Sequence, residues 1–271
     1  MKRYLICHVC LLIILLFGLA FFVFADIRVS SLVIDLEIPS GTSYTHSFIV
    51  SNFGTAPESI TISLVDWNRK SNGEHRYFEA GTLPHSLVDW IEFSPIRFAL
   101  KGGESQQVQF SIAVPKKEEG THWTMLMVEG TPEVITTGKE GKSLFSVIAR
   151  VAYGIKIYQT DPATAQRKGK ITNLDITTFN KSRESQTKVK IEFENTGNTH
   201  LEPEGQVEIR DENGETVATV DIKRFPILPG AKRILEIPLK EKNLQPSRYV
   251  ALAVLDFGGN YVVAGQRVFD I

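Results

Sequence analysis

The side chains that carry most enzyme chemistry occur in this sequence, but not in a pattern that catalysis or metal binding needs. No two histidines of the chain stand at metal-ligand spacing, and both cysteines lie in the N-terminal segment, so a zinc site is not expected. The sequence also lacks a Gly-x-Ser-x-Gly elbow, a phosphate-binding glycine loop and a His-Glu-x-x-His motif. We therefore predict a protein without metal, cofactor or enzymatic activity.

One polar segment still holds a small group of titratable residues. Glu74, His75 and His85 lie between Asn68 and Leu87, a stretch rich in polar and turn-forming residues. We interpret them as solvated loop residues rather than as a metal site. Surface loops of this kind often carry function, so the segment is a candidate contact region.

The composition excludes one class of partner and fits a folded chain. With 30 basic and 31 acidic residues, the chain has no overall positive field that would attract nucleic acid. A hydrophobic content of 42% is typical of proteins that bury cores. An immunoglobulin-type sandwich takes about 100 residues. The 271 residues therefore fit two such domains and a leader.

The first 25 residues have the features of a secretory signal peptide. Lys2 and Arg3 precede a long apolar run, which ends in Val23-Phe24-Ala25. This pattern predicts export and cleavage after Ala25, in a periplasmic or other extracytoplasmic location. The alternative is an uncleaved membrane anchor, because the run nearly has the length of a membrane span. Cleavage would also remove Cys7 and Cys10, leaving the mature protein without cysteine.

The rest of the chain has the periodicity of short β-strands. Apolar and polar residues alternate over 44–50, 60–64 and 108–114, a further strand is expected over 123–128, and turn residues lie between these segments. Many short strands at this spacing predict an all-β sandwich fold. The sequence Asn213-Gly214 between two such segments predicts a two-residue hairpin turn.

An internal repeat indicates two sandwiches of the same type. Residues 98–103 have a counterpart in 225–230, and Asn52 and Asn195 each end an apolar alternation before a glycine-containing turn. Trp123 and Tyr249 occupy equivalent places, and Tyr249 fits the tyrosine corner of immunoglobulin-like domains. We predict two tandem immunoglobulin-like β-sandwich domains, at 26–160 and 169–271, joined by a linker at 161–168.

The longest strand pattern, over 143–158, is the candidate site. Its inner face is apolar throughout, and at about 3.3 Å per residue it would extend some 50 Å, more than one sandwich needs. We predict that its edge binds a protein partner, and that the polar loop at 131–142 orders on contact. In this hypothesis Ile148 enters the partner's core and Arg150 or Lys156 orients an acidic group. The alternative is a strand that domain two shelters. The predicted contact residues are Leu144, Ser146, Ile148, Arg150 and Lys156.

The chain resembles the PapD-like periplasmic chaperones of pilus assembly. The resemblance rests on Val50-Ser51-Asn52, on the segment from Trp90 to Leu100 before 101–105, and on the long strand that ends at Tyr158. It implies an L-shaped pair of sandwiches in which the exposed last strand of domain one completes an unfinished pilus subunit.

The sequence departs from this family at the site itself. Leu36-Glu37 stands where the family has an arginine on the first strand, and Lys156 lies one residue out of step with the family lysine. The alternating large apolar residues of the family strand are reduced to Leu144 and Ile148.

Three functional hypotheses follow. The leading one is a chaperone or scaffold that binds a secreted or pilin-like subunit. The second is a structural or adhesive module of the cell envelope, which resembles the wall-associated WxL-interacting proteins. The third is a carbohydrate-binding sandwich that uses Trp67 and Trp90 as exposed aromatic residues.

Overall fold

The computed structural model of the chain describes residues 27–132, 150–181, 184–239 and 244–271. Within these ranges the secondary structure consists of strands and one 3₁₀ turn, Val88–Trp90. No helix in the described part is long and apolar enough to cross a membrane. Residues 1–25 lie outside the described ranges, so the cleaved signal peptide stays a prediction.

The N-terminal sandwich consists of two sheets around one apolar core. One sheet has the order β1 (Ile27–Val29), β3 (Ser43–Asn52), β8 (Ser105–Ala113) and β6 (Ile91–Ser94). The other has the order β2 (Val33–Glu37), β10 (Val151–Thr160), β9 (Thr121–Pro132), β4 (Glu58–Arg69) and β5 (His75–Phe78), and β7 (Arg97–Leu100) also pairs with β4. The predicted alternation puts Phe48, Ile62, Phe110 and Leu126 into the core between them.

The C-terminal sandwich has three strands in one sheet and four in the other. The first sheet has the order β11 (Gly169–Lys181), β12 (Glu184–Asn195) and β15 (Lys232–Leu239). The second has the order β14 (Thr216–Ile222), β13 (Glu204–Arg210), β16 (Arg248–Asp256) and β17 (Val263–Asp270). The all-β fold with two sandwiches is therefore confirmed. The predicted linker, 161–168, lies between β10 and β11.

The internal repeat has a direct structural counterpart in two buried asparagines. The Asn52 Nδ2 group donates to the carbonyls of Ala56 and Leu100, and its Oδ1 accepts from Gly54 N. In the second domain, Asn195 Nδ2 donates to the carbonyls of Thr199 and Ile227, and its Oδ1 accepts from Gly197 N. Each asparagine thus ties its own turn to the strand or loop that crosses beside it.

The tyrosine corner is also confirmed. Tyr249 lies near the start of β16, is 6% exposed, and its hydroxyl donates to the carbonyl of Gln245 at 2.9 Å. Trp123 lies near the start of the corresponding strand β9, which lies between β4 and β10 as β16 lies between β13 and β17. The two domains therefore use the same position for a large buried aromatic residue.

Three details of the sequence interpretation are wrong. The turn at Asn213-Gly214 spans 211–215, and only Gly214 has positive φ, because a register shift at Arg210 adds a residue to the connection. The segment 68–87 contains a hairpin, β4–β5, rather than only a loop. Trp67 is fully buried, so it cannot serve as an exposed sugar-binding residue.

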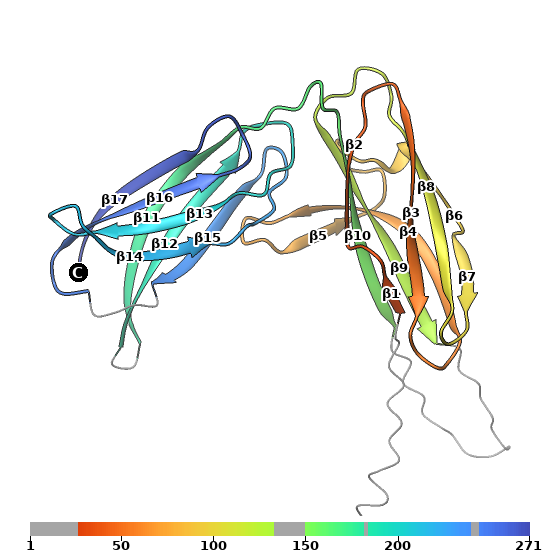
Figure 1. The fold of residues 1–271 in the computed structure, drawn as a ribbon, viewed down its shortest axis with the longest axis horizontal. Helices are drawn as coiled ribbons and strands as arrows, with labels where there is room; N and C mark the ends of the chain where they lie inside the picture. The colour runs from red at the N-terminus through yellow and green to blue at the C-terminus, as the bar shows by residue number, and fades with distance from the viewer. Residues whose placement is uncertain (1–26, 133–149, 182–183, 240–243) are drawn as a thin grey trace, which may run out of the picture.

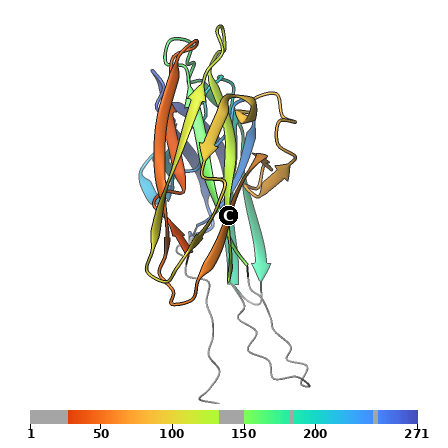
Figure 2. The ribbon, with the colours of Figure 1, turned by 90° about the vertical axis from the view of Figure 1, so that its right-hand side faces the viewer.

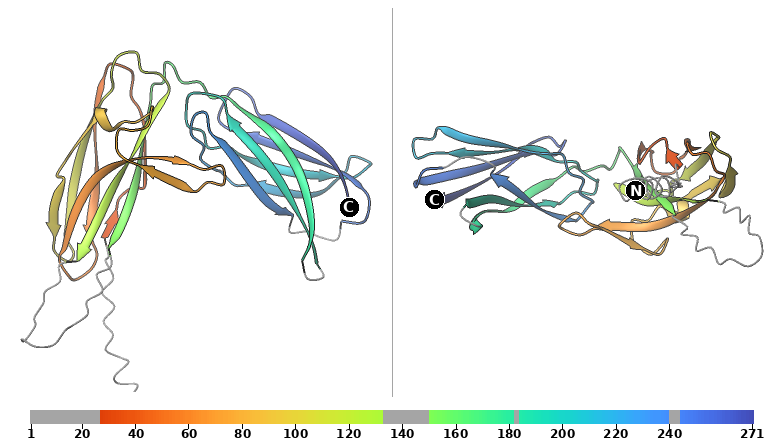
Figure 3. Two further views of the ribbon diagram at one scale, coloured as in Figure 1. Left: turned by 180° about the vertical axis from the view of Figure 1, so that it is seen from behind. Right: turned by 90° about the horizontal axis from the view of Figure 1, so that it is seen from below.

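The two sandwiches are inclined to each other, and the β4–β5 hairpin bridges them (Figure 1). Views from behind and from below show the same arm leaving the first domain toward the second (Figure 3), and a view along the long axis shows the two sandwiches one behind the other (Figure 2). Its tip touches β15, where Ile234 N donates to the carbonyl of Ser71 at 2.8 Å. We call residues 69–75 the arm tip.

Candidate protein-binding edge and interdomain cleft

Strand β10 is covered along only part of its length. On one side it pairs with β9 from Val151 to Thr160. On the other side it pairs with β2 in parallel, and this pairing covers only Lys156 to Thr160. Among the described strands, none pairs with the second side of β10 from Val151 to Ile155. This half of the strand is therefore an open sheet edge.

The register shows which backbone groups the open edge presents. Lys156 N donates to the carbonyl of Leu32 on the β2 side. Because the hydrogen-bonding direction of a strand alternates from residue to residue, Ala152 and Gly154 direct their N–H and C=O groups to the same side. The Ala152 side chain is exposed. The edge thus offers two consecutive sites for strand addition, the arrangement that an incoming strand needs.

The side chains of β10 divide as predicted between core and outer face. Ile155 and Ile157 are fully buried in the first domain. On the outer face, a Cβ at Gly154 would lie 2.4 Å from Met125 Sδ, so glycine lets the Met125 side chain lie flat over the strand. The inner apolar face is therefore confirmed over the described part of the strand.

The predicted contact residues have different outcomes. Leu144, Ser146 and Ile148 lie outside the described residues, and their role stays a prediction. Arg150 is exposed and precedes β10 instead of lying within it, because the strand begins at Val151. Lys156 does lie on β10 and is half-buried.

A second apolar cluster on the outer face of this sheet joins the two domains. It contains Trp67, Trp123, Met125 and Tyr158 from the first domain and Leu228 from the second. The indole Nε1–H of Trp123 donates to the carbonyl of Trp67 at 2.8 Å. Beside this cluster lies a cleft between the sandwiches, with a volume of about 260 Å³, which Arg69, Trp123 and Leu228 help to line.

Two cations flank the buried indole of Trp67 in this cleft. Lys156 Nζ lies 5.8 Å and Arg69 Cζ lies 5.5 Å from the Trp67 ring. The Arg69 Nη1 group donates to the carbonyl of Gly73, and its Nε is buried without a hydrogen-bond partner. Within the described chain, neither cation lies within ion-pair distance of a carboxylate.

The surroundings of these two cations disfavour positive charge. Burial lowers the pKa of Lys156, and the nearby Arg69 charge lowers it further, while Glu202 opposes the shift. Burial, together with Arg69 and Lys156, lowers the pKa of His75 from 6.5 to about 4. Partly desolvated cations without a counter-charge form a site that an incoming anionic group would stabilise.

A second contact between the domains is made by His200 of the second domain, which packs against the first domain. Its Nε2 lies 3.1 Å from Asp35 Oδ2 on β2, and its ring stacks on Tyr158 at 4.3 Å between centroids. The backbone N–H of His200 donates to Thr121 Oγ1. Burial raises the pKa of the Tyr158 hydroxyl, so this ring stays neutral. These contacts hold the top of β10 against the second domain.

The sequence interpretation missed Arg69. The signal was present, since Val65, Trp67 and Arg69 continue the alternation of β4 with Asp66 and Asn68 on the other face. The polar composition of 68–87 conceals it, because such a composition is typical of a loop.

Comparisons with known proteins found similar solved structures at low sequence identity. No family model matches the chain, and no curated protein matches its sequence. Among solved structures, the chain is similar to one from a chaperone–tip adhesin complex of CFA/I fimbriae, with 12% identity, a TM-score of 0.48, and 90% of this chain and 99% of that one covered. The class 5 fimbriae chaperone CfaA has 12% identity and a TM-score of 0.47, with 90% of this chain and 100% of that one covered. The E. coli chaperone DraB has 14% identity and a TM-score of 0.44, with 91% of this chain and 98% of that one covered.

Proposed function

We propose that this protein is an exported chaperone or scaffold that binds an incomplete secreted subunit by adding a strand to it along β10. The observation that carries the proposal is the open edge of β10 from Val151 to Ile155, next to a cleft with two cations that have no described carboxylate at ion-pair distance. An unprotected edge would risk aggregation, so a partner that covers it has a physical reason.

The cleft supports a role for Lys156 beyond the edge itself. Lys156 lies on the same strand as the open backbone groups of Ala152 and Gly154, and on the outer face of the sheet. A partner strand that pairs with the edge would therefore run toward Lys156 and Arg69. An acidic group at the end of that strand would be held there by two charge-assisted contacts.

The first test uses the backbone of the open edge. Ala152→Pro removes an N–H that points away from β9, and it adds a ring where the partner strand would lie. Ala152→Val is the matched control, because it keeps the N–H. We expect Ala152→Pro to abolish co-purification with a co-expressed pilin-like subunit of the same organism, while the control retains it. Equal binding by the two variants would contradict strand addition at this edge.

The second test concerns the residues before β10. Ile148→Asp should abolish binding while the thermal midpoint of the free protein barely changes, because Ile148 would act in the partner's core. A steep fall of that midpoint would show that Ile148 belongs to the protein's own core. Lys156→Ala and Arg69→Ala should each weaken binding by about 2 kcal/mol or more, the usual cost of removing one partner from a desolvated charge pair.

A further inference from the structure

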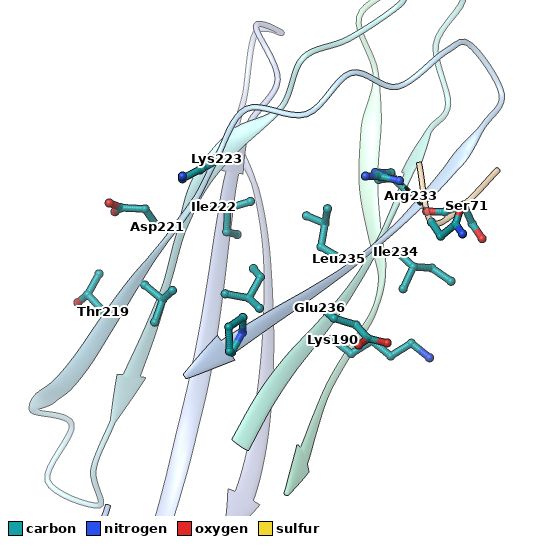
Figure 4. A pocket seen from close by; sticks show the side chains of 14 residues that line it. Ser71, Lys190, Thr219, Asp221, Ile222, Lys223, Arg233, Ile234, Leu235 and Glu236 are labelled. Carbon is teal, nitrogen blue, oxygen red and sulfur yellow. Dashed lines mark hydrogen bonds between the residues drawn. The ribbon is translucent and has the colours of Figure 1, made fainter. Parts of the chain in front are cut away.

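A groove in the second domain separates the edges of its two sheets. It has a volume of about 950 Å³ and lies between β14 and β15. Figure 4 shows Thr219, Asp221 and Lys223 on one wall and Ile234, Leu235 and Glu236 on the other. Both strands end their sheets, so the groove lies between two open edges.

The floor of the groove is apolar. It is formed by Val220 and Ile222 of β14 and by Leu235 and Ile237 of β15. Three of these four side chains are only partly buried, although they belong to the core cluster of the domain. An extended segment in the groove would therefore bury apolar surface that the domain itself leaves partly in solvent.

The register of β15 shows that its outer side can accept another strand. Pro238 lies opposite Lys188 on β12. Because a proline has no N–H, it stands at a position whose backbone faces away from β12. By the alternation of an antiparallel ladder, Ile234 and Glu236 also direct their backbone groups away from β12. Glu236 N–H and the carbonyls of Ile234 and Glu236 therefore face the groove.

The arm tip already occupies the first position of this edge. Ser71 accepts the bond from Ile234 N, and the Arg233 Nη1 group donates to the same carbonyl at 3.3 Å. The guanidinium of Arg233 also packs on Gly73, where a Cβ would lie 1.9 Å from Nη1. A new strand in the groove would continue the line that the arm tip begins.

The rim of the groove has an excess of positive charge. Lys190, Lys223 and Arg233 lie on it, and within the described residues none is in an ion pair. Of the two acidic residues, Glu236 pairs with Lys188 at 3.2 Å, which leaves Asp221. The rim thus favours a ligand with negative charge.

We propose that this groove is a second protein-binding surface, which takes an extended segment of a partner protein with alternating apolar and acidic residues. The apolar side chains would lie on Leu235, Ile237 and Val220. The acidic side chains would lie near Lys190 and Lys223, and the backbone would bond to Ile234 and Glu236 of β15. The surface is independent of the open edge of β10, which belongs to the other domain.

The test uses a fluorescently labelled ten-residue peptide in which valine or isoleucine alternates with glutamate, and a matched peptide with lysine in place of glutamate. Binding to the full-length protein is measured by fluorescence anisotropy. We expect the glutamate peptide to bind at least tenfold more tightly than the lysine peptide. Equal affinity for the two peptides would overturn the proposal.

Two substitutions at one position locate the contact. Glu236→Pro removes the outward N–H at a position equivalent to the tolerated Pro238, whereas Glu236→Ala keeps it. We expect Glu236→Pro to weaken peptide binding at least tenfold and Glu236→Ala to leave it nearly unchanged. Ala152→Pro, in the other domain, should have no effect. The same affinity for both Glu236 variants would contradict strand addition at β15.

Sedimentation of the protein without peptide distinguishes a partner segment from a second copy of the chain. We expect a monomer over the concentrations used for binding. A dimer that Glu236→Pro dissociates would assign the groove to self-association and would overturn the proposal of a partner segment.

Discussion

Replacing the asparagine that ties the turns of the second domain should destabilise that domain alone. In Asn195→Ala, the carbonyls of Thr199 and Ile227 and the N–H of Gly197 each lose their bond to the side chain, at a site that is 0% exposed. The Ile227 carbonyl still accepts from Leu201 N and the Gly197 N–H still donates to the Lys168 carbonyl, so the cost is counted per lost hydrogen bond, at about 1 kcal/mol each. The three groups together give a loss of about 3 kcal/mol.

The assay can separate the domains because all three tryptophans, Trp67, Trp90 and Trp123, lie in the first one. Tryptophan fluorescence during urea unfolding therefore follows domain one, while far-UV circular dichroism follows both. With a urea dependence of about 2 kcal/mol per M, the loss lowers the midpoint of domain two by about 1.5 M. Because Trp67 and Trp123 also contact Leu228 of the second domain, we expect the full shift in the dichroism of Asn195→Ala and a smaller one in its fluorescence.

The equivalent change in the first domain is the matched control. Asn52 makes the same three bonds to Ala56, Leu100 and Gly54. Asn52→Ala should therefore move the fluorescence transition by a similar amount. If the two probes shift together in both variants, the domains unfold as one unit, and the assumption of separate cores is wrong. A shift of less than about 0.5 M in both would refute the energetic reasoning itself.

Three further outcomes are expected. Tyr249→Phe should destabilise the second domain by about 1 kcal/mol in urea melts, because it removes the bond to the Gln245 carbonyl; an unchanged midpoint would mean that this bond contributes nothing. Burial lowers the pKa of His122 from 6.5 to about 4, so the folded state resists protonation; stability should fall as the pH drops from about 6.5 to 4, and His122→Gln should reduce that slope in pH-dependent melts. Intact-mass measurement of protein from its host should give a chain that begins at Asp26, whereas a membrane-bound chain with residues 1–25 would exclude cleavage.

Features that depend on one strand were accessible from the sequence. The alternation of Phe48 and Val50, or of Ile155 and Ile157, specifies a buried face without reference to any other strand. The repeated asparagines were recognisable because the turn and its glycine directly follow each asparagine in the sequence. The tyrosine corner is local in the same sense, since Tyr249 bonds four residues upstream.

Features that depend on which strands become neighbours were not accessible in this way. Lys156 was identified on its own strand, but Arg69 comes from β4 and Arg233 from β15, and only the arm brings these side chains together. The distance from residue 69 to residue 233 in the chain leaves no periodic signal between them. Burial lowers the pKa of Arg233, and the charge of the nearby Arg69 lowers it further.

The same reasoning explains why the exposed edges had to be found in the structure. A strand pattern shows which side chains face the core, but it does not show whether a neighbour covers the backbone on each side. On β10 the pairing with the parallel strand β2 covers only Lys156 to Thr160. On β15 the arm tip bonds to the backbone at Ile234. Each edge is therefore covered at one end by a contact within the chain and open beyond it. A segment that pairs with either edge would extend an existing sheet. Because β10 and β15 are already ordered before binding, only the incoming segment would pay the entropic cost of becoming a strand.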